Sequence, residues 1–364
     1  MRLMSQDLSA IRQQIDKTDI EIQQLLDKRA RLAKQVAQAK FAEEENPVFY
    51  RPERESQVLK NVIARNKDGS LEDDTLTLLF REIMSACLAL QKKLRVGCLG
   101  PEGTYSQAAT FKQFGHGVDC TLLPTIPDVF KEVEAGNLQY GLVPVENSTE
   151  GGINQTLDCF ATMQLQICGE VELPIHHLLL SNAEQLSDIK IVYSHQQSLG
   201  QCRKWLETHL PHIETRAVES NAEAARLAVQ NPESAAIAGK IAATMYDLRK
   251  LEENIEDKPN NTTRWAVISQ QTVPPTGQDK TSLLLLPTHV DKAGALFELL
   301  QPLSNNGINM TRIESHPAKI EKWQYMFFID IEGHHQEALV SQTIDAIKSH
   351  ALVKLLGSYP KAIL

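Results

Sequence analysis

The 364-residue sequence has no CxxC pair, no apolar run of membrane-spanning length and no nucleotide-binding fingerprint. Its six cysteines are scattered, which is typical of reduced, mostly buried thiols and not of a disulfide framework. The glycines at 97, 100 and 103 lack both the dinucleotide spacing and the Gly-Lys-Ser/Thr ending of a P-loop. The polar N-terminus has no signal-peptide core. We therefore expect a cytoplasmic protein that has no membrane partner and binds no nucleotide.

Positive charge is scarce as well, because 37 lysines and arginines stand against 46 aspartates and glutamates, giving a net charge of −9. Such an acidic chain is a poor partner for nucleic acid or anionic membranes. The adjacent pairs His176-His177 and His334-His335 point in different directions and lack a third ligand at metal spacing. We expect no metal and no other cofactor. Any anionic substrate must be held by a few local cations.

The first helical segment contains neither glycine nor proline between Ser5 and Asn46. Apolar residues recur at heptad spacing, which predicts one long helix with a coiled-coil-like seam. Arg29 falls on that seam, and Lys40 lies three turns further along the same face, ~16 Å away. Arg12 lies ~42 Å from Lys40 on a straight helix, so it can serve the same small ligand only from another copy. The cations therefore predict a dimer with shared sites.

Two shorter helices are expected to complete residues 1–93. One opens at Arg51-Pro52, where proline is tolerated, and ends at Asp68-Gly69-Ser70. The other carries an apolar stripe from Leu76 to Leu94, with the amide of Gln91 on it. Three helices bury too little apolar surface alone, which again favours a homodimer or higher homo-oligomer.

This segment resembles the all-helical chorismate mutase family over its full length. The matching residues are Arg12, Arg29, Lys40, Arg54, Glu55 and Gln91. Chorismate is a dicarboxylate that rearranges to prephenate without a nucleophile or proton transfer, so cationic clamping of a compact conformer suffices for catalysis.

The resemblance implies a role for each residue of the mutase site, with Arg29, Lys40 and Gln91 as the catalytic ones. The implied roles are carboxylate binding by Arg12 of a second chain, Arg29 and Arg54, contact with the ether oxygen by Lys40 and Gln91, and acceptance of the substrate hydroxyl by Glu55. The chain departs from some relatives at Arg51, where they carry aspartate, and at Cys87, where they carry serine.

Residues 94–271 alternate between short apolar runs and helical stretches, which predicts an α/β fold with a largely parallel sheet. The strand candidates are 96–99, 119–123, 141–145, 166–170, 175–180, 189–193, 214–218, 234–238 and 265–269. The segment is long enough for two lobes, with a crossing near Leu173-Pro174 and a return near Pro259. A cleft between two lobes is a favourable ligand site.

Three polar stretches lie at the ends of these strands: residues 146–150, 195–202 and 260–265. Taken alone, each is ordinary cap or turn chemistry. Three such edges in one two-lobed domain favour a site in the cleft, since ligands bind at the carboxyl ends of strands.

The same stretches resemble prephenate dehydratase, through Gly100–Ser106, Glu146-Asn147-Ser148, the Gln201 segment and Thr263-Arg264-Trp265. The resemblance implies a two-lobed fold like that of periplasmic binding proteins. It also implies loss of carbon dioxide and the ring hydroxyl from prephenate, giving phenylpyruvate, with Thr263 as donor to the departing hydroxide. The substrate-binding residues implied are Ser106, Glu146, Asn147, Ser148, Gln201, Thr262 and Arg264, the last for a carboxylate.

The last segment, residues 279–364, reads as βαββαβ, which is the ferredoxin-like order. It resembles the ACT domain, an amino-acid-sensing module, although relatives usually carry arginine where His316 stands. The resemblance implies L-phenylalanine as effector, bound by Gly294, Ala295, Leu296, Glu314 and Ser315. The alternative is a plain dimerisation module.

Together the sequence predicts a multidomain chain: an all-α mutase at 1–93, a two-lobed α/β dehydratase at 94–271 and an ACT domain at 279–364. The three resemblances are those of the bifunctional chorismate mutase/prephenate dehydratase family with phenylalanine feedback. Two alternatives stay open: a dehydratase with a helical dimerisation arm, and a non-catalytic amino-acid-binding regulator. A fused prephenate dehydrogenase is excluded by the missing dinucleotide fingerprint.

Overall fold

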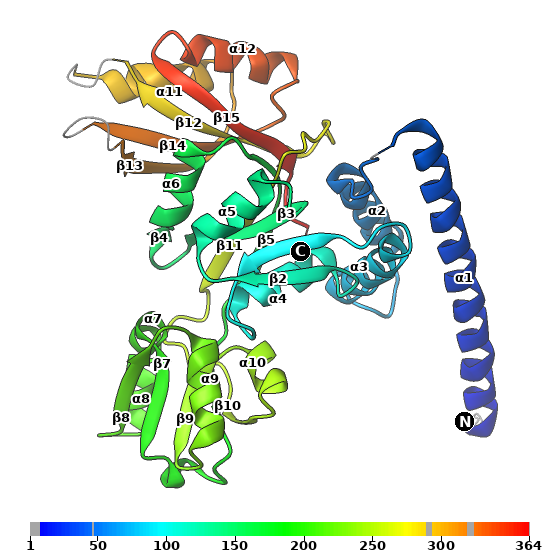
Figure 1. The fold of residues 1–364 in the computed structure, drawn as a ribbon, viewed down its shortest axis with the longest axis vertical. Coiled ribbons are helices and arrows are strands. Elements are labelled where there is room, and N and C mark those ends of the chain that lie inside the picture. The colour runs from blue at the N-terminus through cyan, green and yellow to red at the C-terminus, as the bar shows by residue number, and fades with distance from the viewer. Residues whose placement is uncertain (1–7, 46, 289–292, 319–323, 364) are drawn as a thin grey trace, which may run out of the picture.

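The computed structural model describes residues 8–45, 47–288, 293–318 and 324–363. They form a helical arm, a two-lobed α/β body and a smaller α+β unit (Figure 1). Residues 5–7 and 46 of the first expected helix lie outside the described residues. Within the described ranges, no helix is long and apolar enough to cross a membrane.

Three helices build the N-terminal segment. They are α1 (Leu8–Glu43), α2 (Pro52–Arg65) and α3 (Asp73–Ala89). The single long α1 and the start of α2 at Pro52 confirm the prediction. Helix α3 is shorter than expected, because the backbone N–H groups of Gln91 and Lys92 both donate to the Leu88 carbonyl and close a turn. The placement of Gln91 on a helical stripe is therefore wrong.

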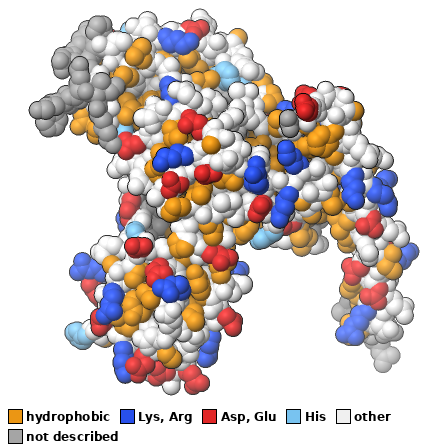
Figure 2. All heavy atoms as spheres, in the orientation of Figure 1, with side chains coloured by type: hydrophobic (Ala, Val, Ile, Leu, Met, Phe, Trp, Pro, Cys, Tyr) orange, Lys and Arg blue, Asp and Glu red, His pale blue; other side chains and the backbone are white. Residues whose placement is uncertain are grey.

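The apolar seam of α1 is exposed. Among its described residues only Ala37 is buried, while Leu25 is 65% exposed. The helix runs beside α3 and projects from the body as an arm (Figures 1 and 2). Large exposed apolar stripes of this kind mark surfaces that pack against a partner.

The first lobe is built on a sheet of order β2-β1-β3-β11-β5, with β4 paired to β3. Its strands are β1 (Arg95–Leu99), β2 (Asp119–Leu123), β3 (Tyr140–Asn147), β4 (Gly151–Gly152), β5 (Gln166–Pro174) and β11 (Thr262–Ser269). Its helices are α4 (Tyr105–Phe114), α5 (Ile126–Glu134) and α6 (Asn154–Thr162).

The second lobe has a sheet of order β10-β6-β9-β7-β8. Its strands are β6 (Leu178–Ser181), β7 (Ile191–His195), β8 (Glu214–Val218), β9 (Ser234–Ala238) and β10 (Arg249–Glu252). Its helices are α7 (Gln196–Gln201), α8 (Arg203–His209), α9 (Asn221–Gln230), α10 (Lys240–Met245) and the 3₁₀ turn η1 (Leu186–Asp188).

Both sheets are mixed, so the expectation of a largely parallel sheet is wrong. β1 pairs in parallel with β2 and β3, but β11 is antiparallel to β3 and β5. β6 is likewise antiparallel to β9 and β10. The reason is the double crossing: the chain leaves the first lobe after β5 and re-enters it through β11. The two crossings lie side by side, since the Ile175 N–H donates to the Asn261 carbonyl.

The C-terminal unit confirms the βαββαβ prediction, with sheet order β13-β14-β12-β15. Its elements are β12 (Asp279–Pro287), α11 (Ala295–Asn305), β13 (Met310–Pro317), β14 (Tyr325–Glu332), α12 (Ala338–Ile347) and β15 (Ala351–Pro360). Alternate residues of β12 face opposite sides: Leu283 and Leu285 pack under the two helices, whereas Leu284 joins the core of the first lobe. Gly357 lets β15 cross β5, because a Cβ there would lie 2.1 Å from the Ile167 carbonyl oxygen.

Candidate functional site

A cleft of about 820 Å³ lies between the two lobes of the α/β body. The first turns of α4, α7 and α9 open onto it through Thr104–Ser106, His195–Ser198 and Ser220-Asn221. Helix N-termini present backbone N–H groups and the positive end of the helix dipole, which favour an anion. Among the described residues that line the cleft, none is a lysine or an arginine.

Thr263 and Asn147 stand opposite each other on the wall of this cleft. The register of β3 against β11 pairs the two residues directly. Asn147 Nδ2 donates to Thr263 Oγ1 at 2.8 Å, and both side chains are buried. The loop after β3 holds the amide, since the backbone N–H and the hydroxyl of Thr149 both donate to Asn147 Oδ1, at 3.0 and 2.5 Å. The Thr263 hydroxyl is thus presented to the cleft in a fixed setting.

Two further residues expected in the dehydratase site also line the cleft. Ser106 Oγ accepts from the Trp265 indole N–H at 3.1 Å. Gln201 reaches across from α7, with its Oε1 2.8 Å from His177 Nε2 and 3.2 Å from the donating Asn261 Nδ2. The structure therefore brings Ser106, Asn147, Gln201 and Thr263 together, as the sequence predicts.

Four residues expected to bind the same substrate do not line the cleft: Glu146, Ser148, Thr262 and Arg264. Successive side chains on a strand point to opposite faces, so the neighbours of Asn147 and Thr263 face away. Ser148 instead closes the loop, because its Oγ accepts from the Thr262 backbone N–H at 2.9 Å.

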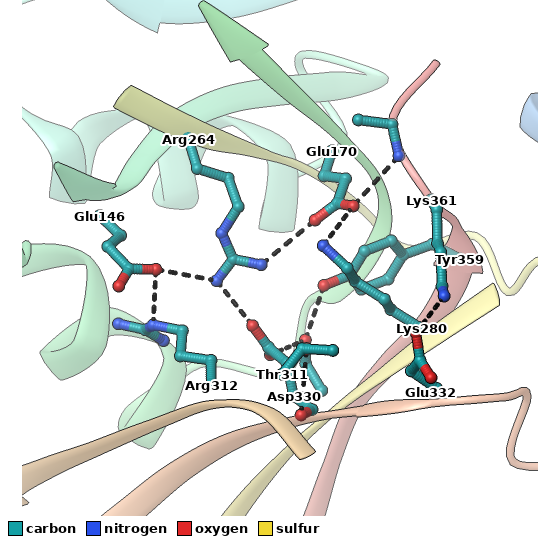
Figure 3. A network of polar contacts seen from close by, with 12 residues as sticks. Glu146, Glu170, Arg264, Lys280, Thr311, Arg312, Asp330, Glu332, Tyr359 and Lys361 are labelled. Carbon is teal, nitrogen blue, oxygen red and sulfur yellow. Dashed lines mark hydrogen bonds and ion pairs between the residues drawn. The ribbon is translucent and has the colours of Figure 1, made fainter. Parts of the chain in front are cut away.

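Arg264 lies in a charged network between the dehydratase lobe and the C-terminal unit (Figure 3). Its Nη2 is 2.6 Å from Asp330 Oδ2 and its Nη1 is 3.2 Å from Glu170 Oε2. Glu146 joins the same network, with its Oε2 2.9 Å from Arg312 Nε. The expectation that Arg264 and Glu146 bind substrate is therefore corrected: both hold the two domains together.

Asp330 is ionised in this network although it is fully buried. Burial raises the pKa of its carboxyl, but the Arg264 charge, a hydrogen bond from Ser282 and the Arg312 charge outweigh it and leave the pKa lowered. The Ser282 hydroxyl donates to Asp330 Oδ1 at 2.5 Å. A buried cation with carboxylates from three strands makes this interface specific and costly to break.

The mutase residues lie along α1 and at the start of α2. Arg29 Nη1 donates to the Ile83 carbonyl of α3 at 3.3 Å, and Lys40 Nζ donates to the Val48 carbonyl at 2.8 Å. Burial and the neighbouring Arg51 charge lower the pKa of Lys40. Arg12, Arg51 and Arg54 are exposed on the single chain. Since α1 is continuous, the predicted ~42 Å between Arg12 and Lys40 stands.

Glu55 and Cys87 differ from their expected setting. The side chain of Glu55 is 3.4 Å from Arg81 Nε, and Arg81 also donates to the Lys112 carbonyl at 2.7 Å. Glu55 therefore faces the dehydratase lobe, which corrects its expected contact with a substrate hydroxyl. Burial raises the pKa of Glu55 to about 7, against the opposing charge of Arg81. Cys87 is buried in α3, and Gln91 is half-buried in the turn beyond it.

The expected effector residues fall in two places. Gly294 has φ +84° and caps α11, directly before Ala295 and the partly exposed Leu296. Ser315 is exposed on β13, but the Glu314 side chain lies against Gly152 of the dehydratase lobe. His316 is buried, with Nε2 2.8 Å from Asp158 Oδ1 of α6. Glu314 and His316 therefore belong to the interface between the domains.

Sequence reasoning did not single out three residues that line the cleft, Tyr105, His177 and Asn261, or Thr149 in the loop beside it. His177 is 1% exposed and touches Tyr105 OH and Gln201 Oε1. The sequence feature that points to His177 is the His176-His177 pair directly after the crossing. Considering the pair only as a metal ligand overlooks its use as a hydrogen-bonding group. Within the described residues, no group of three or more histidine, cysteine or acidic side chains could hold a metal ion.

The fold and the site define a class: a two-lobed α/β enzyme of the prephenate dehydratase type, joined to a helical mutase segment and an ACT unit. Three family models match the chain: chorismate mutase type II at residues 11–92, prephenate dehydratase at 96–273 and ACT domain at 283–348. Curated relatives named for both enzyme activities match nearly the whole chain.

The bifunctional chorismate mutase/prephenate dehydratase of Pseudomonas aeruginosa is 52% identical over 362 residues, 98% of either chain. That of Escherichia coli strain K12 is 32% identical over 381 residues, covering 97% of this chain and 96% of the relative. A prephenate dehydratase from Arthrobacter aurescens, solved in complex with L-Phe, is 33% identical with a TM-score of 0.68 over 73% of this chain and 90% of that one.

The chain belongs to the bifunctional chorismate mutase/prephenate dehydratase family. It is an enzyme with a chorismate mutase and a prephenate dehydratase activity and a C-terminal ACT domain. The alternatives of an inactive helical arm and a non-catalytic regulator are therefore set aside.

Replacing Arg264 tests its corrected role. Arg264→Met leaves the buried Asp330 without the cation at 2.6 Å and Glu170 with Lys280 alone, and losing one partner of a buried pair costs roughly 3–5 kcal/mol. We expect a clear fall in the unfolding midpoint of the dehydratase–ACT unit in denaturant. The matched control is Arg203→Met, which removes an exposed ion pair to Glu207 at 2.8 Å and should leave the midpoint nearly unchanged. Unchanged stability with a raised KM for prephenate would show instead that Arg264 binds the substrate.

Glu55 predicts a pH dependence of stability. Its pKa is about 7 in the fold against an ordinary value of 4.5, so the folded chain binds the proton more tightly. The free energy of unfolding should therefore fall as the pH rises between these two values. Glu55→Gln has no proton to lose, so denaturant unfolding at about pH 5 and about pH 8 should show a smaller loss in the variant. Equal pH slopes in both proteins would contradict a raised pKa at Glu55.

Proposed function

We propose that the cleft between the lobes is the prephenate dehydratase site and that Thr263 donates a hydrogen bond to the departing hydroxide. The observation that carries this is the 2.8 Å bond from Asn147 Nδ2 to Thr263 Oγ1 on the cleft wall. Because the threonine oxygen accepts there, its own proton is free to point into the cleft.

The chemistry needs little acid strength from the protein. The bond between the ring and its carboxylate breaks, carbon dioxide leaves, and the electron pair completes the aromatic ring as the C–O bond breaks. The hydroxide takes up a proton and leaves as water. Aromatisation supplies most of the driving force, so a positioned hydroxyl in a largely closed cleft is sufficient.

The carboxylates of prephenate are bound without lysine or arginine from the cleft wall. The first turn of α4 supplies backbone N–H groups and a helix dipole there, and Ser106 adds a hydroxyl. This replaces the carboxylate role expected of Arg264. Glu219 and Glu223 also line the cleft and disfavour a carboxylate on their side.

We propose that the mutase works as a homodimer in which chorismate lies between Arg29 and Lys40 of one chain and Arg12 of the other. The exposed apolar seam of α1 supports this arrangement, since it meets little of the chain's own described surface. Arg51, Arg54, Cys87 and Gln91 lie at the same end of the helical segment and complete the proposed site.

We further propose a cytoplasmic enzyme with domains at 1–93, 94–271 and 279–364, inhibited by L-phenylalanine at the ACT domain. Gly294 has a left-handed backbone, and no described atom lies within 4 Å of its Cβ position, which supports the start of α11 as the effector site. Ala295, Leu296 and Ser315 are the other described residues of the proposed effector site that do not face the dehydratase lobe.

Thr263→Ala tests the dehydratase assignment. It should reduce phenylpyruvate formation at least a hundred-fold, by analogy with the loss of one donor to a developing anion. Thr263→Ser keeps the hydroxyl and should retain much of the rate. Chorismate loss by the same preparations measures the mutase and should stay near wild type. Full dehydratase activity in Thr263→Ala would refute the role of this hydroxyl.

Subunit mixing tests the shared mutase site. Arg12→Ala and Lys40→Ala homodimers should both be inactive, since each damages every site. Mixed dimers contain one intact site, because both changes then fall in the other site. Recovery of up to a quarter of wild-type activity is expected when the two proteins exchange subunits at equal concentration. Absence of recovery after mass spectrometry has shown heterodimers would mean that each site takes Arg12 and Lys40 from the same chain, and would contradict a shared site.

A further inference from the structure

A directed chain of hydrogen bonds runs from His177 through the second lobe and ends at Thr263. Its links, in order, join His177 Nε2 and Gln201 Oε1 at 2.8 Å, Gln201 Nε2 and Thr149 Oγ1 at 3.3 Å, Thr149 Oγ1 and Asn147 Oδ1 at 2.5 Å, and Asn147 Nδ2 and Thr263 Oγ1 at 2.8 Å. All of the residues lie in or beside the cleft, yet only Thr263 is assigned to the chemistry.

The orientation of the Gln201 amide is fixed by its neighbours. Its Oε1 accepts from Asn261 Nδ2 at 3.2 Å, and its Nε2 donates to Thr149 Oγ1. The oxygen therefore faces His177, and an oxygen can only accept. It follows that His177 donates through Nε2.

The same reasoning fixes the tautomer of His177. Burial lowers the pKa of this imidazole, although the Gln201 hydrogen bond and Glu256 oppose it. A neutral imidazole that carries its proton on Nε2 has an accepting Nδ1. The Tyr105 oxygen lies 3.0 Å from Nδ1, but its proton is donated to the His176 carbonyl at 2.8 Å. The donor role of Nε2 is therefore set by the Gln201 oxygen.

The direction of the hydrogen bonds between Thr149, Asn147 and Thr263 is fixed in the same way. Asn147 Oδ1 accepts from both the backbone N–H and the hydroxyl of Thr149, so its Nδ2 must face Thr263. Thr263 Oγ1 accepts this bond, and its proton is directed to the cleft. Every link from His177 onward donates toward Thr263, and hydrogen bonds aligned in one direction polarise one another.

We propose that His177 is a positioning residue of the dehydratase, which sets the direction of this chain and so makes Thr263 a hydrogen-bond donor. This inference rests on the proposed role of Thr263. His177 itself lies on the crossing between β5 and β6, with Tyr105 from the first lobe on one side and Gln201 from the second lobe on the other. The chain is therefore complete only while both lobes hold their relative position.

Removing one link should lower the dehydratase kcat about ten-fold and change KM for prephenate less, because substrate contacts stay. His177→Asn loses the donor to Gln201, and Thr149→Val loses the hydroxyl at constant shape. The matched controls keep the link: Thr149→Ser retains a hydroxyl, and His177→Gln places an amide N–H where Nε2 stood. Both controls should recover most of the lost kcat. Chorismate loss by the same full-length proteins reports that each variant is folded.

The double variant gives the sharper test. If one break already removes the contribution of the hydrogen-bond chain to kcat, a second break should lower kcat little further. His177→Asn with Thr149→Val should be no slower than about two-fold below the slower single variant, whereas independent roles would multiply the two losses.

Three results would overturn the inference: wild-type kcat in both single variants, an effect confined to KM, or multiplied losses in the double variant. Failure of the Thr263 role itself is seen separately, as dehydratase activity that survives in Thr263→Ala. If Thr263→Ala is inactive but breaking the chain has no effect, only the inference about His177 fails.

Discussion

The register of β11 against β3 is the constraint on which the dehydratase depends. Pairing Thr263 with Asn147 and Arg264 with Glu146 places two hydrogen-bonding residues on one face of the sheet and two charged ones on the other. A slip of one residue would exchange the faces, sending the guanidinium into the cleft and the threonine into the domain interface. The buried ion pairs of Arg264 oppose such a slip, because it would separate the guanidinium from Glu170 and Asp330. The network in Figure 3 thus holds the register of β3 and β11 from the face of the sheet opposite the cleft.

Charge is distributed between the two sites according to their chemistry. The mutase uses cations on the α1 arm, where a dicarboxylate must be clamped in a compact shape. The dehydratase cleft instead relies on helix starts and hydroxyl and amide groups, although its substrate is also a dicarboxylate. A lysine or arginine there would stabilise the carboxylate that must leave as neutral carbon dioxide, and so would favour the ground state. The arginines nearest to the site lie behind the sheet, where they join the domains.

Most of the fold could be predicted from the periodicity of apolar residues and from the glycine, proline and polar residues that end helices and strands. The long α1, all nine strand positions expected in residues 94–271 and the ferredoxin-like order follow from local patterns. The direction of β11 and β6 could not, since it depends on how the chain crosses between lobes. Arg264 was misplaced because its charge was read without the two-residue alternation that puts it opposite Thr263. Glu55 was misplaced because its partner Arg81 lies on another helix, and His177 was overlooked because its partners come from two lobes. Such contacts have no signature in the local sequence.

The adjacency of Thr263 and Arg264 also limits how an effector can act on the dehydratase. Asp330 on β14 and Arg312 on β13 contact Arg264 and Glu146, the direct neighbours of Thr263 and Asn147. Any movement of the ACT domain that alters these pairs must therefore act on the two strands that carry the active site. An effector shifts the dehydratase only by the difference in its affinity for the two arrangements. By linkage, prephenate must then change the affinity for that effector by the same factor, so inhibition and substrate protection are two measures of one coupling energy.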